Sequence, residues 1–177
     1  MPKLQIGSKA IPFSLPGVDD VAHSLADYAD NELVIVGFSC NHCPYAQAWE
    51  GRMRQIQADY ADKSVQLIVI SSNDATKFPA DSFTAMQAHA KDRNFNYPYL
   101  YDESQEVARF YGAERTPEFF VFDKKGILQY HGALDDNYEV PEAVQHHYLR
   151  NALDALLAGQ TPTVAETPAV GCTIKWL

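Results

Sequence analysis

Two cysteines three positions apart are the residues of this sequence best suited to chemistry. Cys40 and Cys43 stand in the stretch FSCNHCPYAQAW, with His42 between them and a proline after the second cysteine. Residues three apart share one face of a helix, so the two Cα atoms can reach the ~5–6 Å separation that a disulfide needs. Zinc sites use the same spacing, and buried cysteines are often ordinary core residues. The spacing alone leaves a redox pair, a peroxide-reducing site, half of a metal site and core packing open.

The position of the pair in the chain favours redox chemistry. Cys40 directly follows the apolar run LVIVGF, which predicts a buried strand whose carboxyl end is where α/β proteins place their chemistry. We expect a helix to begin at Cys40. The partial positive charge at its N-terminus would then stabilise the reactive thiolate. Cys40, more exposed at the helix tip, is then the attacking thiol, and Cys43, one turn in, resolves the mixed disulfide. We expect His42 to lower the pKa of Cys40 further by charge or by a hydrogen bond.

A zinc site is the weaker interpretation of the same residues. Zinc takes about four ligands, and the sequence has no second Cys-x-x-Cys. His146 and His147 lie on a predicted helix without partnering cysteines. We therefore expect no metal and no cofactor beyond the redox-active disulfide, and a metal-binding or non-enzymatic interaction protein remains an alternative.

The elements that must position the cysteines follow from apolar periodicity. LVIVGF (33–38) and VQLIVI (65–70) are unalternating apolar runs, typical of central strands covered on both faces. The residues between them carry an apolar stripe at helical spacing, which predicts a right-handed βαβ unit. The stripe consists of Trp49, Met53, Ile56 and Tyr60. The later elements are a helix near 81–93, a short helix through 107–111 ended by Gly112, a hairpin of FFVFD and ILQYH, and a last helix opened by Pro141 that ends before Gly159.

Length and composition indicate one globular domain, residues 1–177, with its core at about 11–158 and a C-terminal tail, 159–177, docked on the body. Fourteen basic against 23 acidic residues give a net charge of −9, which argues against nucleic-acid and anionic-membrane partners. The longest apolar runs are far shorter than the ~18 residues of a membrane span. The N-terminus lacks the apolar run of a signal peptide, so we expect a cytoplasmic protein. An odd cysteine count, three, argues against a structural disulfide framework.

The ordered set of motifs resembles the thioredoxin superfamily, in its redoxin (AhpC/TSA) branch. IGSKAIPFSLPGVDDVAHSLADYADNELVIVGF is similar to the N-terminal layout of that branch, and RTPEFFVFDKKGILQYHG to its Thr-Pro strand and hairpin. With CNHCP and GCTIKW, the chain looks most like small bacterial thioredoxin-like proteins that carry both signatures. The resemblance implies an α/β, thioredoxin-like fold: a central mixed β-sheet flanked by helices, with an N-terminal extension, an inserted helix segment and a C-terminal tail.

The resemblance also implies an activity and a set of site residues. Cys40 and Cys43 match the redox pair of a thiol–disulfide oxidoreductase, and Pro117 matches the cis-proline that faces it. A cis peptide here agrees with the chemistry, because X–Pro is the only common cis bond. It bends Thr116 toward the site and leaves the Thr116 backbone free to pair with an incoming peptide, while Tyr45 borders the groove. The implied partners are a disulfide-bearing protein or small thiol and an unidentified thiol electron donor.

Two departures from the family pattern matter. LVIVGF lacks the buried acid that thioredoxins keep there, so the proton acceptor for Cys43 is open; Glu118 is a candidate, although a solvated or strand-edge position is expected for it. Peroxidases of the branch place a proline and then a hydroxyl residue ahead of Cys-Pro. Cys43-Pro44 fits that ending, but Val36 and Cys40 replace the proline and the hydroxyl residue. A thiol-dependent peroxidase therefore remains an alternative rather than the main prediction.

The third cysteine, Cys172, lies in the tail sequence GCTIKWL. Apolar Ile174 and Trp176 alternate with polar residues, which predicts an extended segment laid on the body. Cys172 is then either one more buried apolar contact or, if the tail returns to the helix tip, a thiol that exchanges with the Cys40–Cys43 disulfide. Gly171 would permit the close turn that the second arrangement needs.

Overall fold

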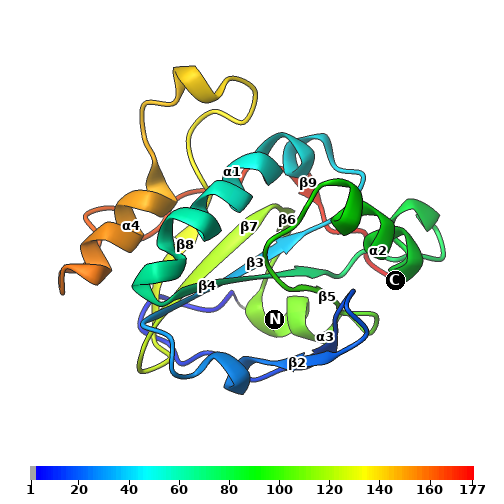
Figure 1. Cartoon of the computed structure of the whole chain (residues 1–177), viewed down its shortest axis with the longest axis horizontal. Helices are drawn as coiled ribbons and strands as arrows, with labels where there is room; N and C mark the ends of the chain where they lie inside the picture. The colour runs from blue at the N-terminus through cyan, green and yellow to red at the C-terminus, as the bar shows by residue number, and fades with distance from the viewer. Residues whose placement is uncertain (1–2) are drawn as a thin grey trace.

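A five-stranded mixed β-sheet forms the centre of the computed structural model, which describes residues 3–177 (Figure 1). The strand order is β5-β4-β3-β7-β8. The three strands β3, β4 and β5 run parallel, whereas β7 is antiparallel to β3 and to β8. Their bounds are β3 Leu33–Ser39, β4 Val65–Ser71, β5 Tyr99–Tyr101, β7 Glu118–Asp123 and β8 Leu128–Gly132. The predicted mixed sheet is confirmed, with β3 as its middle strand.

The predicted βαβ unit is β3, helix α1 (Pro44–Tyr60) and β4. All four residues of the apolar stripe on α1 are buried against the sheet: Trp49, Met53, Ile56 and Tyr60. β3 is buried along its whole length, and its side chains alternate between two cores on opposite faces of the sheet. This double burial explains why the run LVIVGF shows no polar alternation.

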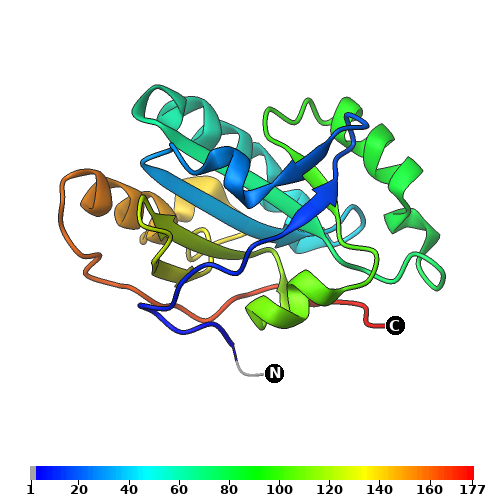
Figure 2. The ribbon, with the colours of Figure 1, turned by 90° about the horizontal axis from the view of Figure 1, so that it is seen from below.

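Different elements cover the two faces of the sheet. Helices α1, α2 (Phe83–Asp92) and α4 (Tyr148–Leu157) pack into one core. Helix α3 (Glu106–Tyr111), the N-terminal segment and the C-terminal tail pack into the other, and Figure 2 shows these three along the lower side of the molecule. The short elements are strands β1 Ser14–Pro16 and β2 Ala22–Ser24, and the 3-10 helices η1 Leu25–Tyr28, η2 Ala61–Lys63, η3 Pro79–Asp81 and η4 Pro141–Ala143.

The last helix differs from the prediction that Pro141 opens it. Pro141 begins only the single turn η4, and α4 starts at Tyr148. Val144 is extended, with φ −61° and ψ 125°. The Asp136 carboxylate accepts the backbone N–H of Gln145, which holds the intervening segment outside the helix.

The tail crosses the body as an extended segment and reaches the sheet edge next to the cysteines. Its strand β9 (Cys172–Thr173) pairs antiparallel with β6 (Arg115–Thr116). The backbone N–H of Ile174 donates to the Glu114 carbonyl, and the Ile174 side chain is buried in the second core. In the described part of the chain, no helix is long and apolar enough to cross a membrane.

Candidate active site

Cys43, rather than Cys40, occupies the N-terminus of α1. Cys40 follows β3 directly, as predicted, but the helix begins only at Pro44, and Cys43 is its N-cap residue. The expectation that the helix begins at Cys40 is therefore wrong. Proline is favoured at the first helical position, where no backbone N–H is needed, so Pro44 sets the start of the helix four residues later than expected.

Both cysteines are buried, contrary to the expectation that Cys40 is exposed at the helix tip. Cys40 has 2% of its surface exposed and Cys43 has none. They form a small cluster with Ala46, against which Tyr45 and Cys172 pack. All three cysteines are free thiols in the structure, and Cys172 is the one with substantial exposed surface.

The surroundings of the two sulfurs separate their acidities. A hydrogen bond from Cys40 lowers the pKa of Cys43 to about 4, with the backbone N–H of Ala46 and the Cys172 thiol adding to the effect against the cost of burial. The same hydrogen bond, burial and the negative charge of Asp81 raise the pKa of Cys40 well above its ordinary value. Cys43 is therefore the thiolate of the pair, and the expected lowering of the Cys40 pKa is wrong.

The Thr116–Pro117 peptide is cis, as predicted, and lies against both cysteines. The Cys43 thiol, when protonated, donates to the Thr116 carbonyl over 3.3 Å, and Thr116 Oγ1 lies 3.7 Å from Cys40 Sγ. The Thr116 backbone is not free for an incoming peptide, however, because it pairs with Cys172 of the chain's own tail. Tyr45 lies at the edge of this site, with its ring 4.3 Å from that of Tyr138.

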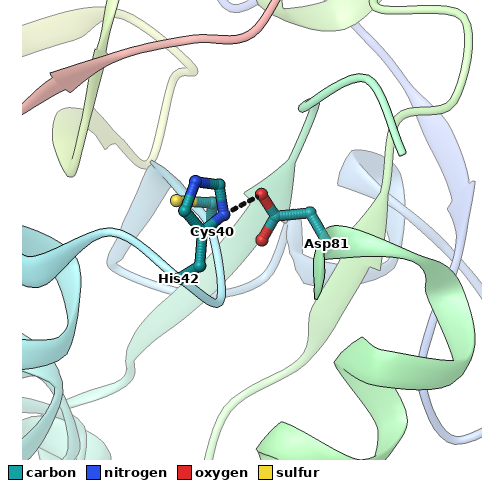
Figure 3. Close-up of side chains that lie close together, drawn as sticks. All are labelled: Cys40, His42 and Asp81. Carbon is teal, nitrogen blue, oxygen red and sulfur yellow. Dashed lines mark ion pairs between the residues drawn. The ribbon is translucent and has the colours of Figure 1, made fainter. Parts of the chain in front are cut away.

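His42 points toward Asp81, which the sequence did not single out (Figure 3). Asp81 is fully buried and forms an ion pair with His42 Nδ1. Its two carboxylate oxygens accept hydrogen bonds from the Asn41 backbone N–H, at 2.8 Å, and from Asn73 Nδ2, at 2.9 Å. The donor atoms of Cys40, His42 and Asp81 all lie within 4.8 Å of one another. His42 therefore contacts an acid that fixes its ring, rather than forming the hydrogen bond with Cys40 that we expected.

Glu118, the candidate proton acceptor, is buried and is part of a different network. Its Oε1 accepts the backbone N–H groups of Glu114 and Arg115 at 3.3 Å, and its Oε2 lies 3.2 Å from His131 Nε2. The solvated or strand-edge position expected for Glu118 is wrong, because β7 lies between β3 and β8 inside the sheet. In the described part of the chain its polar contacts, which also include Lys3, do not involve a cysteine. These contacts connect the β6–β7 corner to β8.

Known proteins match the chain at two levels. The AhpC/TSA family model matches residues 6–131. A crystal structure of an uncharacterized conserved protein from Geobacillus kaustophilus is 37% identical, with a TM-score of 0.93, covering 100% of this chain and 97% of that one. A hypothetical protein from Sinorhizobium meliloti is 34% identical, also with a TM-score of 0.93, covering 99% and 97%.

A more distant crystal structure, of the peroxidoxin BcpB from Mycobacterium tuberculosis, has 19% identity and a TM-score of 0.66, and covers 88% of this chain and 95% of that one. At that identity the likeness concerns the thioredoxin-like fold and not the activity. No curated protein shows significant sequence similarity to the chain.

Proposed function

The chain belongs to the AhpC/TSA family, and we propose that it is a thiol–disulfide oxidoreductase in which Cys43 attacks and Cys40 resolves. The observation that carries this proposal is the placement of Cys43 at the N-cap of α1, in contact with Cys40 and facing the cis-proline corner. The thiolate is the nucleophile in disulfide exchange, and the structure favours the thiolate at Cys43. Family and fold support a redox function in general; the assignment of roles rests on this geometry.

The reaction proceeds in two exchanges. The Cys43 thiolate attacks one sulfur of a partner disulfide, the partner's disulfide bond breaks, and the other partner sulfur leaves as a thiolate. Cys40 then loses its proton and attacks Cys43 Sγ, which forms the Cys40–Cys43 disulfide and releases the second partner sulfur. Two electrons pass from the dithiol to the partner, and a thiol electron donor must return them. The chemistry needs no cofactor beyond the redox-active disulfide.

Cys40 needs a proton acceptor, because its raised pKa keeps it protonated at neutral pH. His42 is the nearest basic side chain in the cluster, and its side chain is 35% exposed, so the proton can pass on to solvent. Asp81 lies against Nδ1, so an N–H donated from Nδ1 to its carboxylate leaves Nε2 as the nitrogen that accepts the proton. We assign His42 as the proton acceptor and Asp81 as its positioning residue.

The peroxidase alternative has less support from the site. Peroxidases of the branch need a hydroxyl residue three positions before the attacking cysteine, and this chain has Cys40 there. The Thr116 hydroxyl lies 3.7 Å from Cys40 Sγ, but its Oγ1 donates to the Cys172 carbonyl at 3.4 Å. We expect hydrogen peroxide to oxidise Cys43 no faster than an ordinary low-pKa thiol.

Metal binding is a second candidate, because Cys40, His42 and Asp81 offer one sulfur, one nitrogen and one oxygen within 4.8 Å. Three protein ligands with an open position resemble a catalytic rather than a structural zinc site. However, both Asp81 oxygens already accept hydrogen bonds from amide groups. Metal analysis of the reduced protein as purified decides between disulfide exchange and metal binding. About one zinc per chain, lost in Asp81→Asn, would favour the metal site.

The test of the proposed function is the identity of the disulfide and its effect on turnover. Oxidised protein should lose two thiols and show a Cys40–Cys43 link by peptide mapping. Reduction of a model disulfide should be abolished in Cys43→Ser, while Cys40→Ser should form mixed disulfides at Cys43 that accumulate because the resolving thiol is missing. A dominant link between chains, or full turnover in Cys43→Ser, would contradict the proposal.

A further inference from the structure

The chain's own tail lies where a partner's cysteine-bearing strand would pair. β9 runs antiparallel to β6, and Cys172 is the register partner of Thr116, the residue before the cis-proline. The Cys172 side chain packs against the cluster of Cys40, Cys43 and Ala46, and it helps to lower the pKa of Cys43. The tail therefore places a thiol of the same chain beside the attacking cysteine, where the cysteine of a bound substrate would lie.

The close approach of the tail depends on a glycine. A Cβ added at Gly171 would lie 2.0 Å from the Thr116 carbonyl oxygen and 2.6 Å from its carbon. Any side chain at 171 would push β9 away from Thr116. The sequence thus contains both the thiol and the one residue type that lets it reach this position.

Access to solvent separates the three thiols. Cys43 has no exposed surface and Cys40 has 2%, whereas Cys172 is half-buried. An external thiol meets the Cys172 sulfur before either sulfur of the pair. Cys172 is therefore the most accessible of the three thiols to a donor in solution.

We propose that Cys172 is a third redox thiol that carries the disulfide from the buried pair to the surface. The inference rests on the proposed exchange at Cys40 and Cys43. The Cys172 thiolate attacks Cys43 Sγ, the Cys40–Cys43 bond breaks, and a Cys43–Cys172 bond forms. Cys40 leaves as a thiolate and takes up one proton in place of the one Cys172 lost, so no electrons enter or leave.

An external thiol, the electron donor, then completes the reduction. Its thiolate attacks the half-exposed Cys172 sulfur, the Cys43–Cys172 bond breaks, and Cys43 leaves. A second donor thiol attacks the mixed disulfide at Cys172, which restores the Cys172 thiol and releases the oxidised donor. Two donor thiols are oxidised for each protein disulfide reduced.

The acidities of the sulfurs support the donor step, in which the Cys43–Cys172 bond breaks and Cys43 leaves. Cys43 has the lowest pKa of the three, and a thiol of low pKa is the better leaving group. Burial and the hydrogen bond and charge of Cys43 raise the pKa of Cys172 to about 11 in the reduced protein, while Lys175 and Arg115 oppose them. When Cys43 is in a disulfide, its negative charge is gone and only burial still raises the pKa of Cys172. The Cys172 thiolate then forms more readily.

The experiment compares the reduction of oxidised wild type, Cys172→Ser and Cys172→Ala by glutathione in a stopped-flow instrument. Access through Cys172 predicts reduction slower by about tenfold or more in both variants. Thr173→Ser, a change at the exposed neighbour in β9, is the matched control and should reduce at the wild-type rate. In Cys40→Ser, mild oxidation should give a Cys43–Cys172 link by peptide mapping.

Equal reduction rates in wild type and both Cys172 variants would overturn the inference, as would the absence of a Cys43–Cys172 link in oxidised Cys40→Ser. Oxidised Cys172→Ser should still contain the Cys40–Cys43 disulfide. If that disulfide is missing, the proposed function itself fails, and the relay with it.

Discussion

At the scale of single residues, the pKa values of the two cysteines shift in the opposite sense to the one their order suggests. Pro44 sets the helix start, so the positive end of α1 faces Cys43. Cys40 lies between the Cys43 sulfur and Asp81, and both raise its pKa. We therefore propose that the second cysteine of the motif is the attacking thiol.

The first prediction concerns the titration of Cys43. Ultraviolet absorbance of the thiolate in the reduced protein should show one group with a midpoint of about 4. The group should vanish in Cys43→Ser and persist in Cys172→Ser with a higher midpoint, because the Cys172 hydrogen bond lowers the pKa of Cys43. A single midpoint near the ordinary value of 9.0 would refute the assignment.

The same shift predicts how stability depends on pH. The pKa of Cys43 in the folded state lies below its ordinary value of 9.0, so ionisation stabilises the folded protein. This contribution is fully present above pH 9 and is lost as the pH falls through about 4. Between these limits the free energy of unfolding of reduced wild type should rise with pH more steeply than that of Cys43→Ser. Parallel curves would show that Cys43 is protonated in the folded protein.

The second residue-scale prediction concerns His42 and Asp81. His42→Ala should slow closure of the mixed disulfide by Cys40 about 10²-fold at neutral pH, the usual effect of losing a general base. The difference should shrink at high pH, where hydroxide can remove the Cys40 proton. His146→Ala, at an exposed histidine, is the control.

Asp81→Asn separates positioning from charge. The Asp81 charge raises the pKa of Cys40, so if charge were its only role, Asp81→Asn would speed closure. We expect slower closure, because His42 loses the partner of its Nδ1. Faster closure in Asp81→Asn would remove Asp81 as a positioning residue.

At the scale of elements, the site depends on the tail as well as on the strand–helix junction. β9 pairs with β6 over only two residues of each strand, and Gly171 permits the close approach that this pairing needs. Gly171→Ala should destabilise the protein by about 1–3 kcal/mol, the usual cost of overpacking. Amide exchange at Ile174, which donates to Glu114, should become faster as the tail is displaced.

Gly51→Ala is the control for this change. Its added Cβ would have its nearest neighbour, Arg54 Nη2, at 3.9 Å, within helix α1. There alanine should stabilise by about 0.5–1 kcal/mol relative to glycine. Equal unfolding free energies for the two variants would mean that the tail does not rest on Thr116.

Sequence patterns predicted the elements better than the details of the site. Unalternating runs identify β3 and β4, because both faces of each strand are buried. Pro44 is a signal for the first helical position and marks the true start of α1, whereas the cysteine spacing suggests a start at Cys40. Asp81 carried no signal: it lies in a 3-10 turn of a polar loop and meets His42 only through the tertiary fold. The alternation of apolar and polar residues predicted an extended tail. Its pairing with β6 could not be predicted, because it depends on contacts between residues distant in sequence.

At the scale of the whole molecule, the fold combines a buried dithiol with a half-buried third thiol. The third thiol lies in the two-stranded β6–β9 sheet and packs against the pair. Two cores enclose the sheet, and the tail belongs to the second. A stabilised Cys43 thiolate lowers the free energy of the reduced form, and a stabilised reduced form makes the disulfide a stronger oxidant. We expect a reduction potential less negative than the approximately −270 mV of thioredoxin.

The pH dependence of that potential provides a separate prediction. Between about pH 4 and 9, reduced Cys43 is a thiolate while Cys40 holds its proton, so reduction takes up two electrons and one proton. The potential should therefore fall by about 30 mV per pH unit near neutrality, half the slope for two protons. Equilibration with glutathione buffers across this range measures it. A slope of about 59 mV per pH unit would mean that both thiols are protonated.

The central claim is that Cys43 is the attacking thiol, and one comparison of mixed-disulfide formation tests it most directly. Cys40→Ser/Cys172→Ser retains only Cys43, and Cys43→Ser/Cys172→Ser retains only Cys40; each is mixed with glutathione disulfide at neutral pH. Removing Cys40 takes away the largest effect that lowers the pKa of Cys43 and so raises that pKa, while the position of Cys43 at the N-terminus of α1 still favours its thiolate. Mass spectrometry should show the mixed disulfide forming at Cys43 at least about tenfold faster than at Cys40. Faster reaction at Cys40 would contradict the account.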